Sequence, residues 1–330
     1  MKTITCIKRV LLVAIVVVLA IGFAGCSRNS EKPTVKIVMA PYFGSWLCTY
    51  GIVSGALASD DVNVVIDQSL AFDDQMMAGN YPIGAMSSAT FAIAGEKSLY
   101  KLKALGVYLA HTGADTTNGV AVVYVKKGSG LQSPQDLAGK RIGVPGLNTG
   151  TTSTFFGLMK NQYNIEESQF TIVDGNPPQL LEFLRRGDIQ AALVLGDPSV
   201  QAYASGEFDI LFNVDQAFEK QYGTYNPASF LTVQTEYLEE NAELVKDIYE
   251  LLMESRQYGE ARLEELAQIY VKEFGGDADF YVNAYSTHYS VTFDSIEGKL
   301  EDSVMAIFSF VKDRGIINTI SQPDELFVEW

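Results

Sequence analysis

The sequence of 330 residues is poor in histidine and cysteine and has fewer basic than acidic residues. Its two histidines, His111 and His288, leave little for histidine-rich metal sites or for most histidine-based catalysis. The 24 Lys and Arg against 40 Asp and Glu give a formal charge of −16. That balance argues against nucleic-acid binding, because phosphate contacts need clustered cations. Hydrophobic residues reach 47%, which suits a globular chain of one large or two ordinary domains.

The first 25 residues have the pattern of an export signal. Basic residues up to Arg9 precede the apolar run Val10–Ala24, which is short for a membrane-spanning helix and typical of a signal peptide. The stretch Phe23-Ala24-Gly25-Cys26 resembles a bacterial lipobox, with Phe23 in place of the usual leucine. We therefore expect a lipoprotein signal at 1–25, a lipid such as palmitate on Cys26, and a tether at 26–34. A plain secretory signal and a retained anchor helix are the alternatives.

This interpretation also places the chain and its cysteines. The lipid would hold the protein on the extracytoplasmic face of the cell membrane. Cys6 would leave with the signal and Cys26 would carry lipid, so Cys48 would have no partner for an intrachain disulfide. The fold would then depend on a large core. The signal accounts for three basic residues, so the remaining body carries −19, a charge that favours solubility.

From residue 35 onward, short apolar runs alternate with amphipathic stretches, a pattern typical of an α/β fold. After Val233 the pattern is helical, over 241–255, 263–274 and 295–312, and we expect no further strand there. The predicted strands before that point are 35–39, 62–66, 82–86, 104–109, 120–125, 141–144, 170–173, 189–195, 209–212 and 230–233.

One pattern occurs twice. Residues 76–88 show a helix end, Gly79, a short strand and a loop of small polar residues. Residues 183–198 show the same order around Gly187. The repeat indicates either two similar lobes or a chance likeness between two ordinary βα units. In two lobes, each such loop would lie at the carboxyl end of a strand, where open α/β sheets bind ligands.

Two motifs resemble those of a known family. Ser133, Pro134 and Asp136 form a capping-box pattern that starts a short helix ending at Gly139. The whole stretch 131–146 is similar to the "DLKGKRIGV" segment of periplasmic-type solute-binding proteins. Residues 181–193 with Pro198 are similar to their "ALxxGxxDAAxxxxP" element. The likeness is to the group serving importers of nitrate, sulfonates, taurine, bicarbonate and thiamine-precursor pyrimidines.

This resemblance implies a two-lobed periplasmic-binding-protein fold of type II, with two mixed sheets flanked by helices and two hinge strands. Lobe one would comprise 35–118 plus 234–330, and lobe two 119–228. The chain would cross between them near 119–125 and 229–233. A small molecule would bind in the cleft between the lobes, and closure would be a hinge motion. The implied partners are an ABC permease and its ATPase, and no cofactor or metal is implied.

In lobe one, two segments are candidates for ligand contact. Aromatic side chains after the first strand could stack on a ligand or could pack beneath the next helix, and we place Tyr42 first. Hydroxyls and free N–H groups at the start of the helix 89–94 could hold an oxyanion, or they could only cap the helix. These candidates are Tyr42, Phe43, Trp46, Ser87, Ser88 and Thr90.

In lobe two, the turn Thr149-Gly150-Thr151-Thr152 offers the same chemistry, and its glycine permits close backbone approach. It is not a phosphate loop, because no Gly-Lys-Ser/Thr follows. Asp197 could accept from a ligand amine or cap a helix, and Gly196 stands where the family often has a large residue. Weaker candidates are Asn118, Asn176, Tyr222 and Tyr225.

The pattern therefore predicts a binding protein rather than an enzyme. The best candidate loops contain no Lys or Arg, which favours a neutral or zwitterionic organic ligand over nitrate or bicarbonate. We expect capture of a sulfonate, a pyrimidine or thiamine precursor, or a similar solute for an ABC importer. One alternative is a sensor that reads a ligand for a membrane receptor. A thiamine-pyrimidine synthase is less favoured, because the cysteine-rich iron motif of those enzymes is missing here.

Overall fold

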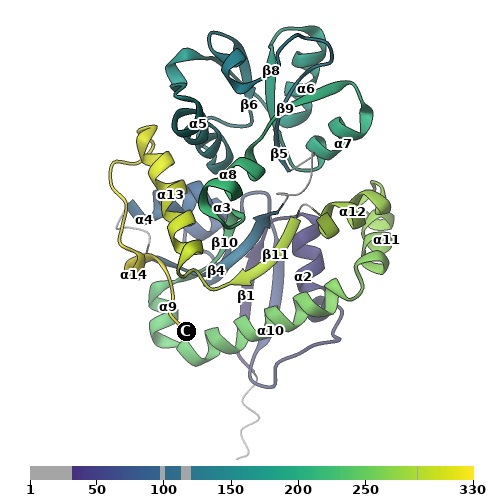
Figure 1. Cartoon of the computed structure of the whole chain (residues 1–330). Helices are drawn as coiled ribbons and strands as arrows, with labels where there is room; N and C mark the ends of the chain where they lie inside the picture. The colour runs from purple at the N-terminus through teal and green to yellow at the C-terminus, as the bar shows by residue number, and fades with distance from the viewer. Residues whose placement is uncertain (1–31, 97–100, 113–119, 288) are drawn as a thin grey trace, which may run out of the picture. The chain divides into compact units, whose positions relative to one another are not determined.

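The structure is a computed structural model that describes residues 32–96, 101–112, 120–287 and 289–330 (Figure 1). The side chains of Asp197 and Val200 lie outside this description. The predicted signal peptide, Cys26 and Asn118 lie outside it as well. Within the described ranges, no helix combines the length and the apolar character needed to cross a membrane.

The first of two sheets is six-stranded and mixed. Its strands lie in the order β11 (Tyr289–Asp294), β4 (Leu102–His111), β10 (Asn226–Gln234), β3 (Ile83–Ser87), β1 (Thr34–Met39) and β2 (Asn63–Gln68). Strand β1 is parallel to β2 and β3, whereas β10 is antiparallel to β3 and β4. We call this sheet and its helices the first lobe.

The second sheet repeats most of that arrangement. Its order is β7 (Thr171–Asp174), β6 (Arg141–Val144), β8 (Ala191–Leu195), β5 (Ala121–Lys126) and β9 (Phe208–Asn213). Strands β7, β6 and β8 are parallel, and β5 is antiparallel to β8 and β9. Strands β3 and β8 take equivalent places and follow Gly79 and Gly187, which both have a positive φ. This confirms the predicted two mixed sheets and the internal repeat. We call this sheet and its helices the second lobe.

Helices flank both sheets. Those after the first-lobe strands are α2 (Phe43–Val53), α3 (Phe72–Met77), α4 (Ser88–Glu96), α9 (Thr235–Glu240), α10 (Ala242–Glu260), α11 (Leu263–Phe274), α12 (Ala278–Thr287), α13 (Lys299–Asp313) and α14 (Pro323–Leu326). Those of the second lobe are α5 (Gly150–Tyr163), α6 (Pro177–Arg186), α7 (Asp197–Ser205) and α8 (Val214–Tyr222). Short 3-10 turns cover Pro134–Leu137 and Glu167–Gln169.

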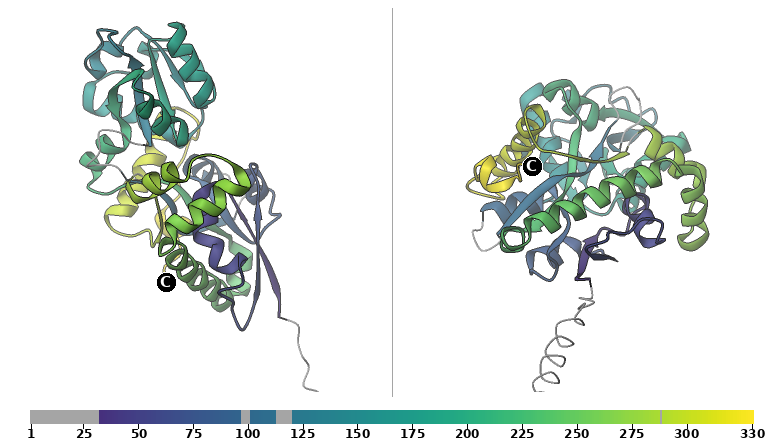
Figure 2. Two further views of the ribbon diagram at one scale, coloured as in Figure 1. Left: turned by 90° about the vertical axis from the view of Figure 1, so that its right-hand side faces the viewer. Right: turned by 90° about the horizontal axis from the view of Figure 1, so that it is seen from below.

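The long helix α10 shows how hydrophobic spacing fixes packing. Val245, Ile248 and Leu252 recur at helical spacing and are buried in the first-lobe core. The helix lies against α2, and both views of Figure 2 show it running beside the first sheet. Gly259 permits the closest approach, because a Cβ placed there would lie 1.9 Å from the carbonyl oxygen of Leu47.

The turn before β6 forms as its capping pattern predicts, although it is shorter. The Asp136 carboxylate accepts from the backbone N–H groups of Gln132 and Ser133, and these bonds hold its pKa below the usual value. The turn ends at Leu137 because Ala138 leaves the helical region. Gly139 then takes a positive φ that leads the chain into β6.

The structure corrects one expectation about the C-terminal part. Strand β11 lies at the edge of the first sheet, antiparallel to β4, where the sequence predicted only helix and loop. Its residues do alternate apolar and polar, but one edge strand among helices gives a weak signal.

The sheets also show where the chain changes lobe. All of β5 lies in the second sheet and all of β10 in the first. The chain therefore changes sheet between His111 and Ala121, and again between Asn213 and Asn226. The return comes before the predicted 229–233, because β10 is one continuous strand that begins at Asn226.

An apolar cluster connects the two lobes. Both sheets belong to one compact unit, Thr34–Trp330. Phe91 and Phe230 of the first lobe and Phe155 of the second belong to the same buried cluster. Phe308 and Phe310 of α13 belong to it as well, so this helix packs on both lobes.

Candidate functional site

The start of α4 is hydrogen-bonded to a carboxylate of the same chain. Asp73 of α3 accepts from the backbone N–H of Ser87 at 2.7 Å and from its hydroxyl at 2.7 Å. It also accepts from the Thr90 hydroxyl at 3.0 Å. Two of the predicted anion contacts, Ser87 and Thr90, are therefore already bound to an acidic group. This half of the candidate site is poorly suited to a second negative charge.

Burial of Asp73 raises the pKa of its carboxyl, although the bonds from Ser87 and Thr90 act in the opposite direction. We expect Asp73→Ala to lower the free energy of unfolding by about 1 kcal/mol, because partly buried donors at the helix start lose their acceptor. Asp74→Ala, which removes the carboxylate next to it, is the matched control. Denaturant unfolding measures both, and equal losses would contradict the capping role.

The start of α5 is capped by its own hydroxyls. Thr149 accepts from the backbone N–H of Thr152 at 3.2 Å, and its hydroxyl donates to that of Thr152 at 2.9 Å. The Thr152 hydroxyl donates to the carbonyl of Gly146. These bonds fix the turn and leave the half-buried Thr151 as the hydroxyl best placed for another contact.

The two helix starts meet across the lobes. Gly150 lies against Ser88, because a Cβ built on Gly150 would come 2.3 Å from the Ser88 Oγ. Side chains larger than hydrogen are therefore excluded at Gly150 in this arrangement. The structure thus brings together two candidate segments that are far apart in the sequence.

The three aromatic candidates after β1 have different surroundings. Tyr42 precedes α2 and is 52% exposed, whereas Phe43 is 2% exposed. Phe43 packs in an aromatic cluster with Tyr270 and Tyr285. Trp46 lies in the same cluster, and its indole N–H is buried with no acceptor among the described residues. Tyr42 is the most exposed of the three, whereas Trp46 is partly buried.

A tyrosine that the sequence analysis missed lies next to Gly196. A Cβ on Gly196 would lie 3.3 Å from the hydroxyl of Tyr289, the first residue of β11. Tyr289 stacks on Tyr285 with ring centres 5.1 Å apart. The backbone of Asp197 begins α7 at this point. No signal short of predicting β11 could have placed Tyr289 here.

Tyr225 has another environment. Its hydroxyl donates to the Asp294 carboxylate at 2.7 Å, and burial raises its pKa. Asp294 ends β11, whereas the contact with Gly196 is made at the first residue of that strand. Tyr225 is therefore not brought together with the other candidates.

A buried carboxylate joins the two connections between the lobes. Asp215 is 1% exposed and lies 3.2 Å from Nδ1 of His111, at the end of β4. It accepts from the N–H groups of Val120 and Ala121 at 3.1 and 2.8 Å and from the Asn226 amide at 3.0 Å. Burial alone would raise the pKa of Asp215, but His111 and these hydrogen bonds hold it below the usual value. Both side chains therefore help to hold the ends of β4, β5 and β10 to α8.

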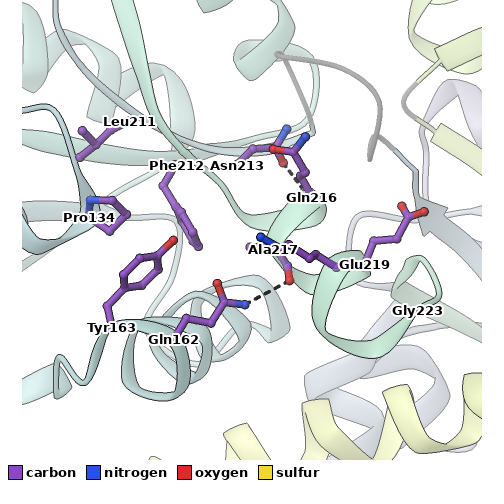
Figure 3. Close-up of a pocket in the computed structure, with 11 residues that line it drawn as sticks. Pro134, Gln162, Tyr163, Leu211, Phe212, Asn213, Gln216, Ala217, Glu219 and Gly223 are labelled. Atoms are coloured by element: carbon purple, nitrogen blue, oxygen red, sulfur yellow. Dashed lines mark hydrogen bonds between the residues drawn. The ribbon is translucent and has the colours of Figure 1, made fainter.

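One hollow lies away from these residues, in the second lobe (Figure 3). It measures about 690 Å³, and Tyr163, Phe212 and Gln162 are among the residues that line it. The Gln162 amide donates to the carbonyl of Ala217 on α8. None of the predicted site residues lines this hollow, so we do not assign the ligand to it.

The described residues hold no group of three His, Cys, Asp or Glu side chains arranged for a metal ion. Cys48 is fully buried, and burial raises the pKa of its thiol well above its usual value. A thiol in that state is a poor nucleophile.

The fold defines the class. The described chain is a two-lobed α/β protein that resembles solved periplasmic binding proteins. A structure from Candida albicans, described as showing the generic periplasmic binding protein fold, matches at a TM-score of 0.63 with 14% identity, over 90% of this chain and 96% of that one. The periplasmic aliphatic sulphonate binding protein of Escherichia coli matches at 0.70 with 11% identity, over 91% and 93%.

The sequence defines the family. Residues 80–262, more than half of the chain, match the family model described as NMT1/THI5 like, and the chain belongs to that family. The taurine-binding periplasmic protein of Escherichia coli (strain K12) is 28% identical over 182 residues, which is 55% of this chain. The match covers 52% of that relative, so the chain spans about half the length of the curated protein it resembles.

Proposed function

We propose that this protein is the extracytoplasmic solute-binding component of an ABC importer, with a permease and an ATPase as partners. It captures a small organic solute between its lobes, and it binds this solute without transforming it. The observation that carries the proposal is the meeting of Ser88 and Gly150, which joins two helix starts from separate lobes. Membership of the NMT1/THI5-like family and the taurine-binding relative support it.

The charges at the two helix starts indicate how a solute would be oriented. The first-lobe start already holds the Asp73 carboxylate, so a negative group of the ligand would go to the start of α5. A sulfonate or a similar oxyanion carried by an otherwise neutral or zwitterionic molecule fits this arrangement. Tyr42, and the wall made by Tyr285 and Tyr289, would then face the organic part.

We also propose that residues 1–25 are removed as a lipoprotein signal and that a lipid on Cys26 anchors the protein to the membrane. The lipobox-like stretch supports this proposal. Metabolic labelling with a tagged palmitate tests it, since Cys26→Ser should abolish incorporation, whereas Cys48→Ser should leave it unchanged. Label retained in Cys26→Ser would overturn the assignment.

Ligand capture is tested by thermal unfolding of the full chain with taurine, alkanesulfonates, pyrimidines and amino acids. A ligand at a hundred times its Kd should add about 2.7 kcal/mol to the free energy of unfolding. Absence of stabilisation by every compound would contradict small-solute binding of these classes. Stabilisation accompanied by turnover of the compound would favour the enzyme alternative.

For the site, Thr151→Asp is expected to weaken binding of the stabilising sulfonate at least about 100-fold, because it places a negative charge where the anion would lie. Thr171→Asp, an exposed change in the same lobe, is the matched control and should leave the affinity unchanged. Titration calorimetry measures both. Equal affinity in Thr151→Asp and the unaltered chain would remove the start of α5 from the site.

A further inference from the structure

The helix α13 connects the lobes at a place that neither hinge connection reaches. Phe308 packs on Phe91 and Phe230 of the first lobe. Two residues later, Phe310 faces Gly157 of α5, where a Cβ would lie 2.2 Å from its ring. Both α4 and α5 contact α13, which Figure 1 shows beside them. Because Gly157 has no side chain, the ring of Phe310 sits directly on the backbone of α5.

The chain after α13 returns to the first lobe. The carboxylate of Glu96, the last residue of α4, accepts from the backbone N–H groups of Asn318 and Thr319 at 2.5 and 3.0 Å. The Ser321 hydroxyl donates to the carbonyl of Gly95 at 2.9 Å. The segment 299–321 is therefore attached to the first lobe at both of its ends, with the second lobe in contact between them.

Arg314, just after α13, makes the polar contact with the second lobe. Its Nε and Nη2 donate to the two oxygens of Glu167 at 2.7 and 2.9 Å. Its Nη1 donates to the carbonyl of Leu147 at 2.5 Å and to the hydroxyl of Ser153 at 3.1 Å. The guanidinium lies 5.2 Å from the ring centre of Phe156, and its side chain is only 10% exposed. A bidentate arginine–carboxylate pair of this kind is among the stronger ion pairs in proteins.

The contacts of Arg314 fall on both sides of the candidate binding turn. Leu147 comes three residues before Gly150, and Ser153 comes three residues after it. An arginine attached to the C-terminal segment thus fixes the turn that meets Ser88. Separation of the lobes at this turn requires either that Arg314 release it or that α13 leave the first lobe.

We propose that Arg314 is a positioning residue that ties the second lobe's binding turn to α13 and so favours the joined arrangement of the lobes. The effect on ligand affinity rests on the proposed function, but the effect on lobe separation does not. A binding-competent state that is less populated lowers the apparent affinity in proportion. Loss of Arg314 should therefore separate the lobes more often and weaken binding, although this side chain need not touch the ligand.

The first test measures lobe separation without ligand. Spin labels on cysteines introduced at Asn283 of α12 and Ala204 of α7, both exposed, report the distance between the lobes in the full chain. We expect Arg314→Ala to shift the distribution of distances between the labels to longer values. Arg314→Lys should shift it less, because lysine keeps the charge but not the bidentate geometry. Glu167→Gln should also shift it. An unchanged distribution in folded Arg314→Ala would overturn the proposal, and if that variant does not fold, Arg314→Lys and Glu167→Gln decide in the same way.

The second test measures affinity, with taurine and an alkanesulfonate as probes. Arg314→Ala is expected to weaken binding by a factor between about 5 and 150, the range of typical coupling between separate sites. Arg185→Ala is the matched control, since Arg185 pairs with Glu207 at 2.6 Å on the exposed surface of the second lobe. Equal losses in both variants would overturn the positioning role. If the unaltered chain binds neither probe, the sulfonate assignment fails, while the distance measurement still decides the proposal about Arg314.

Discussion

Replacing Asp215 by alanine is expected to lower the free energy of unfolding by about 3 kcal/mol, because it leaves several buried hydrogen-bond donors without their acceptor, at about 1–3 kcal/mol each. The change leaves His111 without its carboxylate and the N–H groups of Val120 and Ala121 without an acceptor. Typical proteins are stable by only about 5–15 kcal/mol, so this loss would be a large fraction of the total stability. Denaturant unfolding at pH 7 measures the loss.

The same carboxylate predicts a dependence on pH. The folded-state pKa of Asp215 is lowered, so the charged carboxylate stabilises the fold above its unfolded pKa of about 3.9. That stabilisation is lost as the pH falls through the lower, folded-state pKa. The difference in the free energy of unfolding between the unaltered chain and Asp215→Ala should therefore be largest at pH 6. It should become smaller below about pH 4.

Asp209→Ala is the matched control, because Asp209 is an exposed acid on β9 whose side chain accepts a 3.3 Å bond from the N–H of Gly128. It should change the free energy of unfolding by no more than about 0.5 kcal/mol. A loss below about 1 kcal/mol in Asp215→Ala would show that the fold does not depend on the hydrogen bonds to this carboxylate.

Replacing Gly259 by alanine is expected to destabilise the first lobe by about 3 kcal/mol, the upper end for overpacking a core. The new Cβ would lie 1.9 Å from a backbone oxygen, that of Leu47, which cannot rotate away as a side chain can. Helices α10 and α2 would have to move apart. The gain in helix propensity from glycine to alanine, about 1 kcal/mol, is smaller than this cost.

Gly95→Ala provides the comparison for Gly259→Ala. Gly95 is also helical, but the nearest neighbour of an added Cβ would be a methyl group at the end of the Leu326 side chain, 2.8 Å away. That side chain can turn aside, so the propensity gain should offset most of the strain. Thermal unfolding of both variants shows whether Gly259→Ala is destabilised more than Gly95→Ala. A Gly259→Ala protein as stable as Gly95→Ala would contradict the close helix contact.

Much of the fold could be predicted from local patterns. Every strand predicted before residue 234 is present, because buried strands in α/β sheets appear as short apolar runs. Which strands pair with one another was harder to predict. Nothing in β10 indicates that it pairs entirely with the first sheet, and nothing in Tyr289–Asp294 indicates that it pairs with β4. Pairing depends on residues far apart in the chain, which local patterns do not contain.

The candidate site shows the same limit. Ser88 and Gly150 were predicted because each belongs to a small polar loop after a strand. The hydrogen bond from Ser87 to the carboxylate of Asp73 was not predicted. Asp73 lies 14 residues before Ser87, whereas the capping-box pattern joins residues only three apart. Arg314 reaches Ser153 from 161 residues later. A sequence can indicate which loops lie at strand ends, but not which distant charges pack against them.

The order of strands has a consequence for synthesis on the ribosome. All strands of the second sheet lie between Ala121 and Asn213, so that sheet can assemble once this continuous stretch has emerged. The first sheet must wait, because β10 separates β3 from β4 and is made only after the whole second sheet. Strand β1 can pair early with β2 and β3, whereas both neighbours of β4, the strands β10 and β11, are made only later. The hydrophobic β4 segment is thus the strand of the first sheet that stays unpaired longest, and it is where a newly made chain most needs protection from aggregation.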